Sequence, residues 1–199
     1  MISFCLTVAA LLVGLDRGFP TPKRSRVHSS RQQTIAADSA WYDRKTFAVV
    51  RVVDGDTLHL DVPDGEGRIT KVRLLGIDAP EMGDANKKPM YFAEEATRLA
   101  TDLAFRKIVT IYLDEQAGSR DKYDRLLAYV ELPDGKFLNE EILLGGCAYA
   151  DLRFRHSYYY KYKQLEASAR TAKAGLWAGV VPEQMPLWRQ KTRPDADSE

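Results

Sequence analysis

Apolar and polar residues alternate in short runs between residues 46 and 138, and this pattern predicts a β-rich domain. The runs are rich in β-branched residues, and Gly, Pro or Asp closes most of them, as is typical of strands that end in turns. The predicted strands are Thr46–Val53, Thr57–Val62, Ile69–Ile77, Ile108–Leu113 and Leu126–Leu132, the last pairing with Lys136–Leu138 across Pro133-Asp134-Gly135.

Helical spacing follows the third strand and returns near the C-terminal end. Apolar residues recur every three or four positions over Tyr91–Arg106 and again over about Ser157–Leu176, and a short helix, Asn139–Leu144, ends at a Gly-Gly pair. Five strands, with a helix after the third and more helices at the end, predict a mainly β fold of the α+β class. The expected architecture is a five-stranded OB-type barrel packed with about three helices.

The chain divides into four predicted segments. Residues 1–15 are apolar, residues 16–40 form a basic, polar linker, residues 41–181 form the folded domain, and residues 182–199 form a flexible, polar tail. As a helix, Ile2–Leu15 would span about 21 Å, which is short of the roughly 30 Å hydrocarbon core of a bilayer and suits the core of an export signal.

Export is not the only interpretation of that segment. No Lys or Arg precedes the apolar run, and the basic residues that follow it oppose translocation. We expect a secreted or cell-envelope protein, and the alternatives are a membrane tether formed by residues 1–15 or a cytoplasmic extension.

Composition and charge narrow the function. Hydrophobic residues make up 45% of the chain and charged residues 29%, which indicates a globular protein. The net charge of +1 argues against a protein that coats nucleic acid through a global positive field. Two cysteines exclude a disulfide-rich scaffold. Any phosphate chemistry must therefore come from a local cluster of side chains, which favours the participation of a metal cation.

Two acidic groups are candidates for holding that cation. Asp54 and Asp56 flank Gly55, and Asp78 and Glu81 lie on either side of Pro80 at the end of a predicted strand. Hard cations such as Ca²⁺ prefer oxygen ligands, which Asp56, Asp78 and the carbonyl of Ala79 can supply together with water. No Cys or His cluster lies nearby, which argues against zinc. Taken alone, each acidic pair is better explained as an ordinary turn, so the metal site is predicted only from the two pairs together.

Two arginines add phosphate chemistry to these carboxylates. Arg73 lies within a predicted strand, and Arg125 immediately precedes another. A guanidinium group is suited to two-pronged binding of phosphate, although either arginine alone could form an ordinary salt bridge. A metal, two arginines and a carboxylate that activates water together indicate phosphodiester hydrolysis.

These motifs together resemble the signature of the staphylococcal nuclease (thermonuclease) homologues, the SNase-like family. The resemblance extends from about Phe47 to Trp177, and its motifs occur in the same order as in that family. They are Asp56-Thr57, Arg73, Asp78-x-Pro80-Glu81 and Asp121-Lys122-Tyr123-x-Arg125.

The resemblance implies an OB-type barrel with three helices and a Ca²⁺-dependent nuclease. Such an enzyme hydrolyses DNA and RNA at the P–O5′ bond and leaves 3′-phosphates. By resemblance, Asp56, Asp78 and the Ala79 carbonyl would ligate Ca²⁺, and Asp54 would support them. Glu81 would act on the attacking water, Arg73 and Arg125 would clamp the phosphate, and Lys122 and Tyr123 would contact a neighbouring phosphate. DNA and RNA are the expected partners of a monomer.

The sequence departs from the family pattern at several positions. Ala79 replaces a common threonine, Asp124 replaces a usual glycine, and Leu152 and Phe154 stand where two base-stacking tyrosines are expected. Tyr149 or Tyr158 is an alternative stacking residue. A non-catalytic module that binds nucleic acid or protein is the alternative function, although both Asp, Glu81 and both Arg are present.

Overall fold

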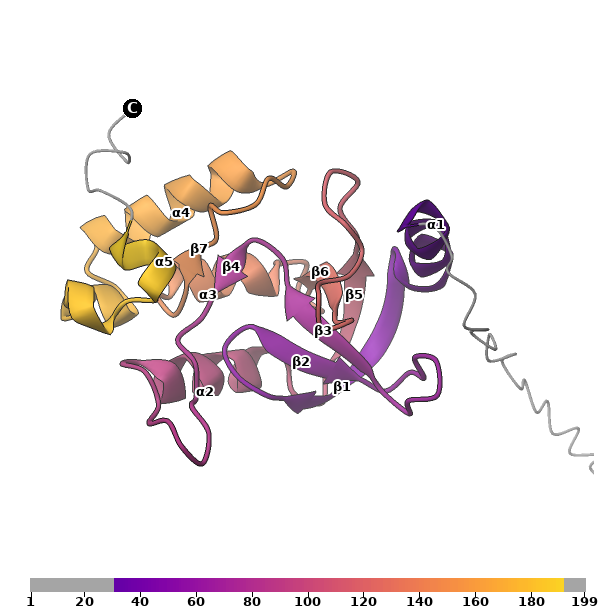
Figure 1. Ribbon diagram of the computed structural model, residues 1–199, viewed down its shortest axis with the longest axis horizontal. Coiled ribbons are helices and arrows are strands. Elements are labelled where there is room, and N and C mark those ends of the chain that lie inside the picture. The colour runs from indigo at the N-terminus through magenta and orange to yellow at the C-terminus, as the bar shows by residue number, and fades with distance from the viewer. Residues whose placement is uncertain (1–30, 192–199) are drawn as a thin grey trace, which may run out of the picture.

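Five strands close into a barrel in a computed structural model that describes residues 31–191. The strands follow one another around the barrel in the order β1-β2-β3-β6-β5 (Figure 1). Their bounds are β1 Lys45–Val52, β2 Thr57–Leu60, β3 Thr70–Leu74, β5 Ile108–Tyr112 and β6 Leu126–Glu131. Neighbouring strands are antiparallel except β3 and β6, which run parallel. The predicted α+β barrel is therefore confirmed.

Apolar residues that alternate along these strands fill the barrel. Side chains such as Leu58, Leu60, Val72, Ile111 and Leu126 are almost completely buried in one cluster. Since successive side chains of a strand point to opposite faces, the polar residues between them face outward or towards the site. The barrel thus gives the loops at its rim a rigid support.

The predicted third strand, Ile69–Ile77, is in fact two strands. β3 ends at Leu74, and β4 (Ile77–Asp78) pairs with β7 (Tyr149–Ala150) in a separate two-stranded ladder. Gly76 makes the break with φ of +80°, where a Cβ atom would also lie 2.5 Å from the ring of His156. This turn ends β3 and brings Asp78 within hydrogen-bond distance of Arg73 on that strand.

Helices cover one end of the barrel in Figure 1. Helix α2 (Ala93–Ala104) buries alanines at helical spacing, α3 (Leu138–Leu144) packs on α2 and β6, and α4 (Tyr159–Thr171) packs on α3 and β7. The predicted final helix stops earlier than expected and is followed by a 3₁₀ turn, η1 (Gly175–Ala178), because Lys173 and Gly175 adopt positive φ. The predicted strand after the last hairpin turn is reduced to one bridge between Glu131 and Phe137.

Residues 31–40, which we expected to be linker, instead form most of helix α1 (Arg31–Tyr42). Asp38 of this helix is buried and accepts hydrogen bonds from Ser119 Oγ at 2.7 Å and Arg120 Nε at 2.9 Å. Arg120 also donates to Asp64 at 2.5 Å, so one guanidinium ties α1 to two loops. The predicted apolar segment 1–15 lies outside the described residues, and none of the described helices is long and apolar enough to cross a membrane.

The C-terminal tail is also partly folded. Residues expected to be flexible form η2 (Pro182–Gln184) and helix α5 (Leu187–Gln190). Arg189 of α5 is buried and pairs with Glu166 of α4, and Trp188 contacts Asp78. These long-range contacts, rather than local patterning, order the segment up to residue 191.

Candidate functional site

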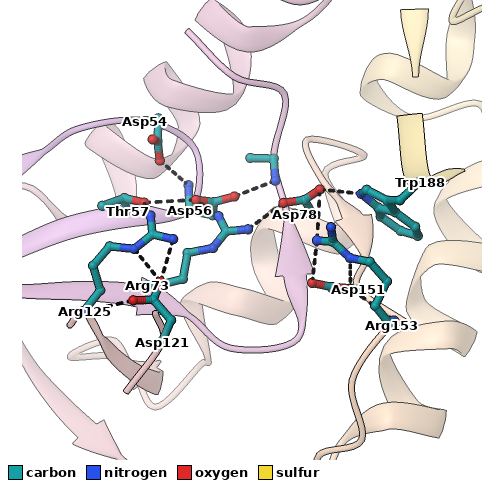
Figure 2. A network of polar contacts seen from close by, with 11 residues as sticks. Asp54, Asp56, Thr57, Arg73, Asp78, Asp121, Arg125, Asp151, Arg153 and Trp188 are labelled. Atoms are coloured by element: carbon teal, nitrogen blue, oxygen red, sulfur yellow. Dashed lines mark hydrogen bonds and ion pairs between the residues drawn. The ribbon is translucent and has the colours of Figure 1, made fainter. Parts of the chain in front are cut away.

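The acidic and basic residues predicted from the sequence meet at one end of the barrel (Figure 2). Asp56 begins the turn into β2, Arg73 lies on β3, Asp78 ends β4 and Arg125 precedes β6. The β2–β3 register places Thr57 opposite Arg73, and the turn at Gly76 brings Asp78 back towards the same arginine. Residues distant in the sequence thus form one polar cluster.

Asp56 is the buried acidic residue of this cluster. Its Oδ2 accepts a hydrogen bond from the backbone N–H of Ala79 at 2.6 Å, and its Oδ1 accepts one from the Thr57 hydroxyl at 3.1 Å. The neighbouring Gly55 allows this close approach, because a Cβ atom there would lie 2.7 Å from the Cβ of Ala79. The backbone contacts therefore hold the Asp56 carboxylate in one orientation.

Arg73 bridges the two predicted metal ligands. Its Nη1 pairs with Oδ1 of Asp56, and its Nη2 donates to Oδ1 of Asp78 at 2.6 Å. Only 12% of the Arg73 side chain is exposed. One cationic group thus compensates two carboxylates that would otherwise repel each other.

Arg125 is held in place by Asp121. Its Nε and Nη2 both lie 2.7 Å from Oδ2 of Asp121, and its Nη1 donates to the Thr57 hydroxyl at 3.3 Å. Oδ1 of Asp121 accepts the backbone N–H groups of Tyr123 and Arg125, which fixes the loop. Thr57 therefore links Arg125 to Asp56.

Lys122 and Tyr123 form the exposed tip of that loop. Tyr123 is 67% exposed, and Lys122 Nζ lies 4.8 Å from the centre of its ring. The Arg125 guanidinium carbon lies 5.5 Å from the same ring. The tip therefore presents a cation and an aromatic face to solvent beside the cluster.

Asp54 and Glu81 complete the acidic side. Oδ1 of Asp54 accepts the backbone N–H of Asp56 at 3.0 Å, and burial raises the pKa of Asp54 while Arg73 lowers it. Partial desolvation, followed by the nearby charge of Asp54, raises the pKa of Glu81 above its usual range. Within residues 31–191 the Glu81 carboxylate has no hydrogen-bond or ion-pair partner, so it is available to a ligand.

The donor atoms of this cluster fit a hard cation such as Ca²⁺. Asp56 and Asp78 each direct a carboxylate oxygen at the guanidinium group of Arg73. Carboxylate oxygens are also the ligands that Ca²⁺ prefers. Among the described residues, no three His, Cys, Asp or Glu side chains are grouped closely enough to hold a metal by themselves. A bound cation would therefore need backbone carbonyl oxygen and water in addition to the two carboxylates.

Three further residues contact Asp78 or its neighbours, and none of them belongs to a motif in the sequence. Oδ2 of Asp78 accepts a hydrogen bond from Trp188 Nε1 at 2.7 Å and lies 3.5 Å from Nη2 of Arg153. Arg153 is in turn held by both oxygens of Asp151, at 2.8 Å each. A single tryptophan in a polar tail was the only sequence signal for this group.

The four candidate positions for base stacking differ in how far their side chains are exposed to solvent. Tyr149 is only 1% exposed and Tyr158 packs on Tyr129 with ring centres 4.6 Å apart, so neither presents a free ring face for a base. Phe154 is 64% exposed, whereas Leu152 is partly buried. Of these four residues, Phe154 alone offers an open aromatic surface.

The backbone of Asp124 is in the left-handed conformation. Glycine adopts this conformation most easily, which accounts for the glycine expected at this position. The φ of Asp124 is +63°, a region that Asp tolerates better than most residues with a side chain. Its carbonyl oxygen accepts a hydrogen bond from Arg120 Nη1 at 3.0 Å. The substitution therefore preserves the loop path, with the carboxylate on the outer, exposed side.

Comparison with known proteins places this chain in a family. The model of the family described as "Staphylococcal nuclease homologue" matches residues 71–179, which include Arg73, Asp78, Glu81 and Arg125. The chain is 30% identical to the thermonuclease of Staphylococcus hyicus over 137 residues, which cover 68% of this chain and 78% of that protein.

Two further relatives are named as uncharacterized endonucleases. The one from Escherichia coli O157:H7 is 32% identical over 143 residues, covering 72% of this chain and 84% of its own. The one from Haemophilus influenzae is 32% identical over 151 residues, covering 76% of each chain. With a family match over more than half of its length and relatives of this identity and coverage, the chain belongs to the staphylococcal nuclease homologue family.

Proposed function

We propose that this protein is a Ca²⁺-dependent nuclease that hydrolyses DNA and RNA at the P–O5′ bond and leaves 3′-phosphates. The observation that carries the proposal is the convergence of Asp56, Asp78, Arg73 and Arg125 in one cluster, beside a Glu81 carboxylate that has no partner within residues 31–191. The names thermonuclease and endonuclease among its relatives support the same reaction class.

In this proposal, Asp56, Asp78 and the carbonyl oxygen of Ala79 hold the cation. Asp54 contributes indirectly, because it accepts the backbone N–H of Asp56 and fixes the start of β2. A bound Ca²⁺ supplies positive charge that neutralises and polarises the scissile phosphate. The buried hydrogen bond from Ala79 N–H keeps the Asp56 carboxylate in place before the substrate arrives.

The two arginines bind the phosphate and stabilise the charge that builds on it. Arg73 already lies against two carboxylates, which limit its side-chain freedom, and in this proposal its remaining N–H groups bind a phosphate oxygen. Arg125 is oriented by Asp121 through two N–H groups, which leaves little side-chain freedom to be lost on binding. Pre-oriented donors of this kind stabilise a transition state without reorganisation.

Glu81 takes a proton from the attacking water. The raised pKa makes its carboxylate a stronger base than an ordinary glutamate, and it has no competing partner among the described residues. The bond from the water oxygen to phosphorus forms as the P–O5′ bond breaks, and O5′ leaves with the bonding electron pair and takes up a proton from solvent. Lys122 and Tyr123, at the exposed loop tip, contact a neighbouring phosphate of the strand.

The cell compartment and the oligomeric state form a separate part of the proposal, and only the sequence supports it. We propose that residues 1–15 direct export of a monomer, with membrane anchoring or a cytoplasmic location as the alternatives. Fractionation of cells that express the full chain, with and without residues 1–15, distinguishes these locations.

The test of the nuclease proposal uses the full chain on single-stranded DNA, double-stranded DNA and RNA. Each substrate is incubated with Ca²⁺, with Mg²⁺ and with EGTA, beside Glu81→Gln and the control Glu94→Gln, an exposed residue at the start of α2. We expect Ca²⁺-dependent degradation, a loss of about 10²- to 10⁴-fold in turnover for Glu81→Gln and no loss for the control.

Intact substrates under every metal condition, from protein shown to be folded, would overturn the proposal. Binding of DNA without Ca²⁺ and without cleavage would then indicate the non-catalytic module. Normal turnover by Glu81→Gln would instead remove the general-base role from Glu81 and leave the nuclease assignment standing.

A further inference from the structure

Asp78 divides its two carboxylate oxygens between opposite sides of the cluster. Oδ1 accepts a hydrogen bond from Nη2 of Arg73, the arginine proposed to bind phosphate, at 2.6 Å. Oδ2 faces the C-terminal part of the chain, where it accepts the indole N–H of Trp188 at 2.7 Å (Figure 2). The carboxylate is therefore held from both sides, and its outer partner comes from 110 residues further along the sequence.

Helix α5 is firmly attached where it presents Trp188. The next residue, Arg189, is buried and pairs with Glu166 of α4. Oε2 of Glu166 also accepts the backbone N–H of Ala150 at 2.7 Å, and Ala150 lies on β7 opposite Ile77 of β4. Helix α5 is thus anchored to the same two-stranded ladder that carries Asp78 (Figure 1).

Arg153 holds the indole ring itself. Its guanidinium carbon lies 4.6 Å from the centre of the Trp188 ring, and Asp151 fixes the guanidinium through two hydrogen bonds. Nη2 of Arg153 also lies 3.5 Å from Oδ2 of Asp78. A cation on its face and a carboxylate at its N–H therefore determine how the Trp188 ring lies.

We infer that Trp188 is a positioning residue that orients the Asp78 carboxylate for the cation, an inference that rests on the proposed function. An indole has one hydrogen-bond donor and no acceptor, so it fixes one carboxylate oxygen and leaves the other directed at the site. Outer partners of ligating carboxylates typically contribute 10- to 100-fold to metal affinity or activity. The short helix α5 thereby becomes part of the active site.

The test compares Trp188→Phe with Trp177→Phe in the full chain. Both changes replace an indole with a phenyl ring, but the Trp177 N–H is buried without a hydrogen-bond partner in the described structure. Calorimetric titration with Ca²⁺ alone should show about tenfold weaker binding for Trp188→Phe and an unchanged affinity, within twofold, for Trp177→Phe. The Ca²⁺ concentration for half-maximal cleavage should rise in parallel, while KM for DNA at saturating Ca²⁺ stays the same.

A second measurement uses only the unaltered protein, so it does not depend on whether a variant folds. In ¹H–¹⁵N spectra of the unaltered protein, the indole N–H signal of Trp188 should move when Ca²⁺ is added, because its acceptor is the carboxylate that binds the cation. The indole signal of Trp177 should stay in place. This readout applies even if Trp188→Phe lowers the melting temperature too far for titration.

The outcomes separate this inference from the function beneath it. If the unaltered protein binds Ca²⁺ and cleaves DNA while Trp188→Phe matches Trp177→Phe, or while the Trp188 signal does not move, the positioning role is wrong and the nuclease proposal stands. If the unaltered protein neither binds Ca²⁺ nor cleaves nucleic acid, the proposed function fails and the inference falls with it.

Discussion

Nη2 of Arg73 donates to Oδ1 of Asp78 at 2.6 Å across the turn that Gly76 makes between β3 and β4. The same guanidinium pairs with Asp56, so it compensates both carboxylates that the proposal assigns to the cation. A single buried arginine thus stabilises the acidic pair in the absence of metal. If the proposed cation binds these carboxylates, the stability of the protein should depend on both the arginine and the cation.

We predict that Arg73→Gln lowers the free energy of unfolding in Ca²⁺-free buffer by about 3 kcal/mol, because two largely buried carboxylates lose the guanidinium group that they share. Added Ca²⁺ should then raise the melting temperature of the variant more than that of the unaltered protein, since the cation relieves the repulsion that the arginine had balanced. The exposed Arg51→Gln serves as the control and should change stability by less than about 0.5 kcal/mol. Equal Ca²⁺ stabilisation of the variant and the unaltered protein would contradict this account.

Asp124 allows a test of the backbone conformation of the loop from Asp121 to Arg125. Asp124→Gly and Asp124→Ala remove the same carboxylate, but only Ala has a Cβ atom that is disfavoured at φ of +63°. We expect Asp124→Ala to be less stable than Asp124→Gly by up to about 1 kcal/mol, as measured by urea unfolding. A more stable Ala variant would mean that the loop does not keep this conformation in solution.

Asp38 provides a test of whether helix α1 belongs to the folded domain. Asp38→Asn removes the charge that faces Ser119 and Arg120, and Arg120 is itself almost fully buried. We predict a loss of about 2 to 3 kcal/mol in unfolding free energy, because breaking a buried pair leaves a charge poorly compensated. The exposed Asp61→Asn should have little effect, and equal stabilities of the two variants would show that α1 docks only weakly.

A buried network around His156 predicts how stability changes with pH. The Tyr129 hydroxyl donates its one proton to Asp114, so Nδ1 of His156 donates to Tyr129, and Nε2 is buried without a partner in the described structure. Burial therefore lowers the pKa of His156 below its ordinary value of 6.5. As the pH falls below 6.5, the unfolded chain takes up a proton before the folded one does, and stability decreases.

The corresponding experiment is urea unfolding of the unaltered protein and of His156→Gln at pH 8.0 and pH 5.5. The decrease between these pH values should be about 1 kcal/mol smaller in the variant, which lacks the titrating ring. His59, whose pKa burial also lowers, is present in both proteins and cancels in the comparison. Identical decreases would show that His156 is protonated in the folded state at pH 5.5.

Local sequence patterns predicted most of the barrel but not where its elements end. Alternating residues and turn residues act over a few positions, so the strands from Thr46 to Leu132 were placed to within a few residues. The break between β3 and β4 was not predicted, because it depends on Gly76 lying against His156, 80 residues away. The end of the final helix was likewise decided by positive φ at Lys173 and Gly175.

In the candidate site, too, the sequence predicted which residues take part, whereas the tertiary structure decided how their side chains pair. Resemblance to a family motif identified Asp56, Arg73, Asp78, Glu81 and Arg125, and the structure brings them together in one region. The sequence contained no sign that Arg73 pairs with both aspartates or that Asp121 orients Arg125, because side-chain pairing depends on how strands are registered. Asp124 looked like a departure from the motif, and the backbone explains it as a residue that tolerates the conformation of glycine.

The sequence by itself determined the α+β barrel class and the family membership that its motifs suggest, and it supplied the set of candidate site residues, since these depend on local periodicity and residue chemistry. Only the tertiary structure decided that α1 and α5 belong to the folded domain and that Trp188 contacts Asp78. Residues 31–40 and 182–191 are polar and lack strong periodicity, so nothing local predicts their order. Their order comes instead from the buried pairs Asp38–Arg120 and Glu166–Arg189, which form only when the closed barrel brings distant segments together.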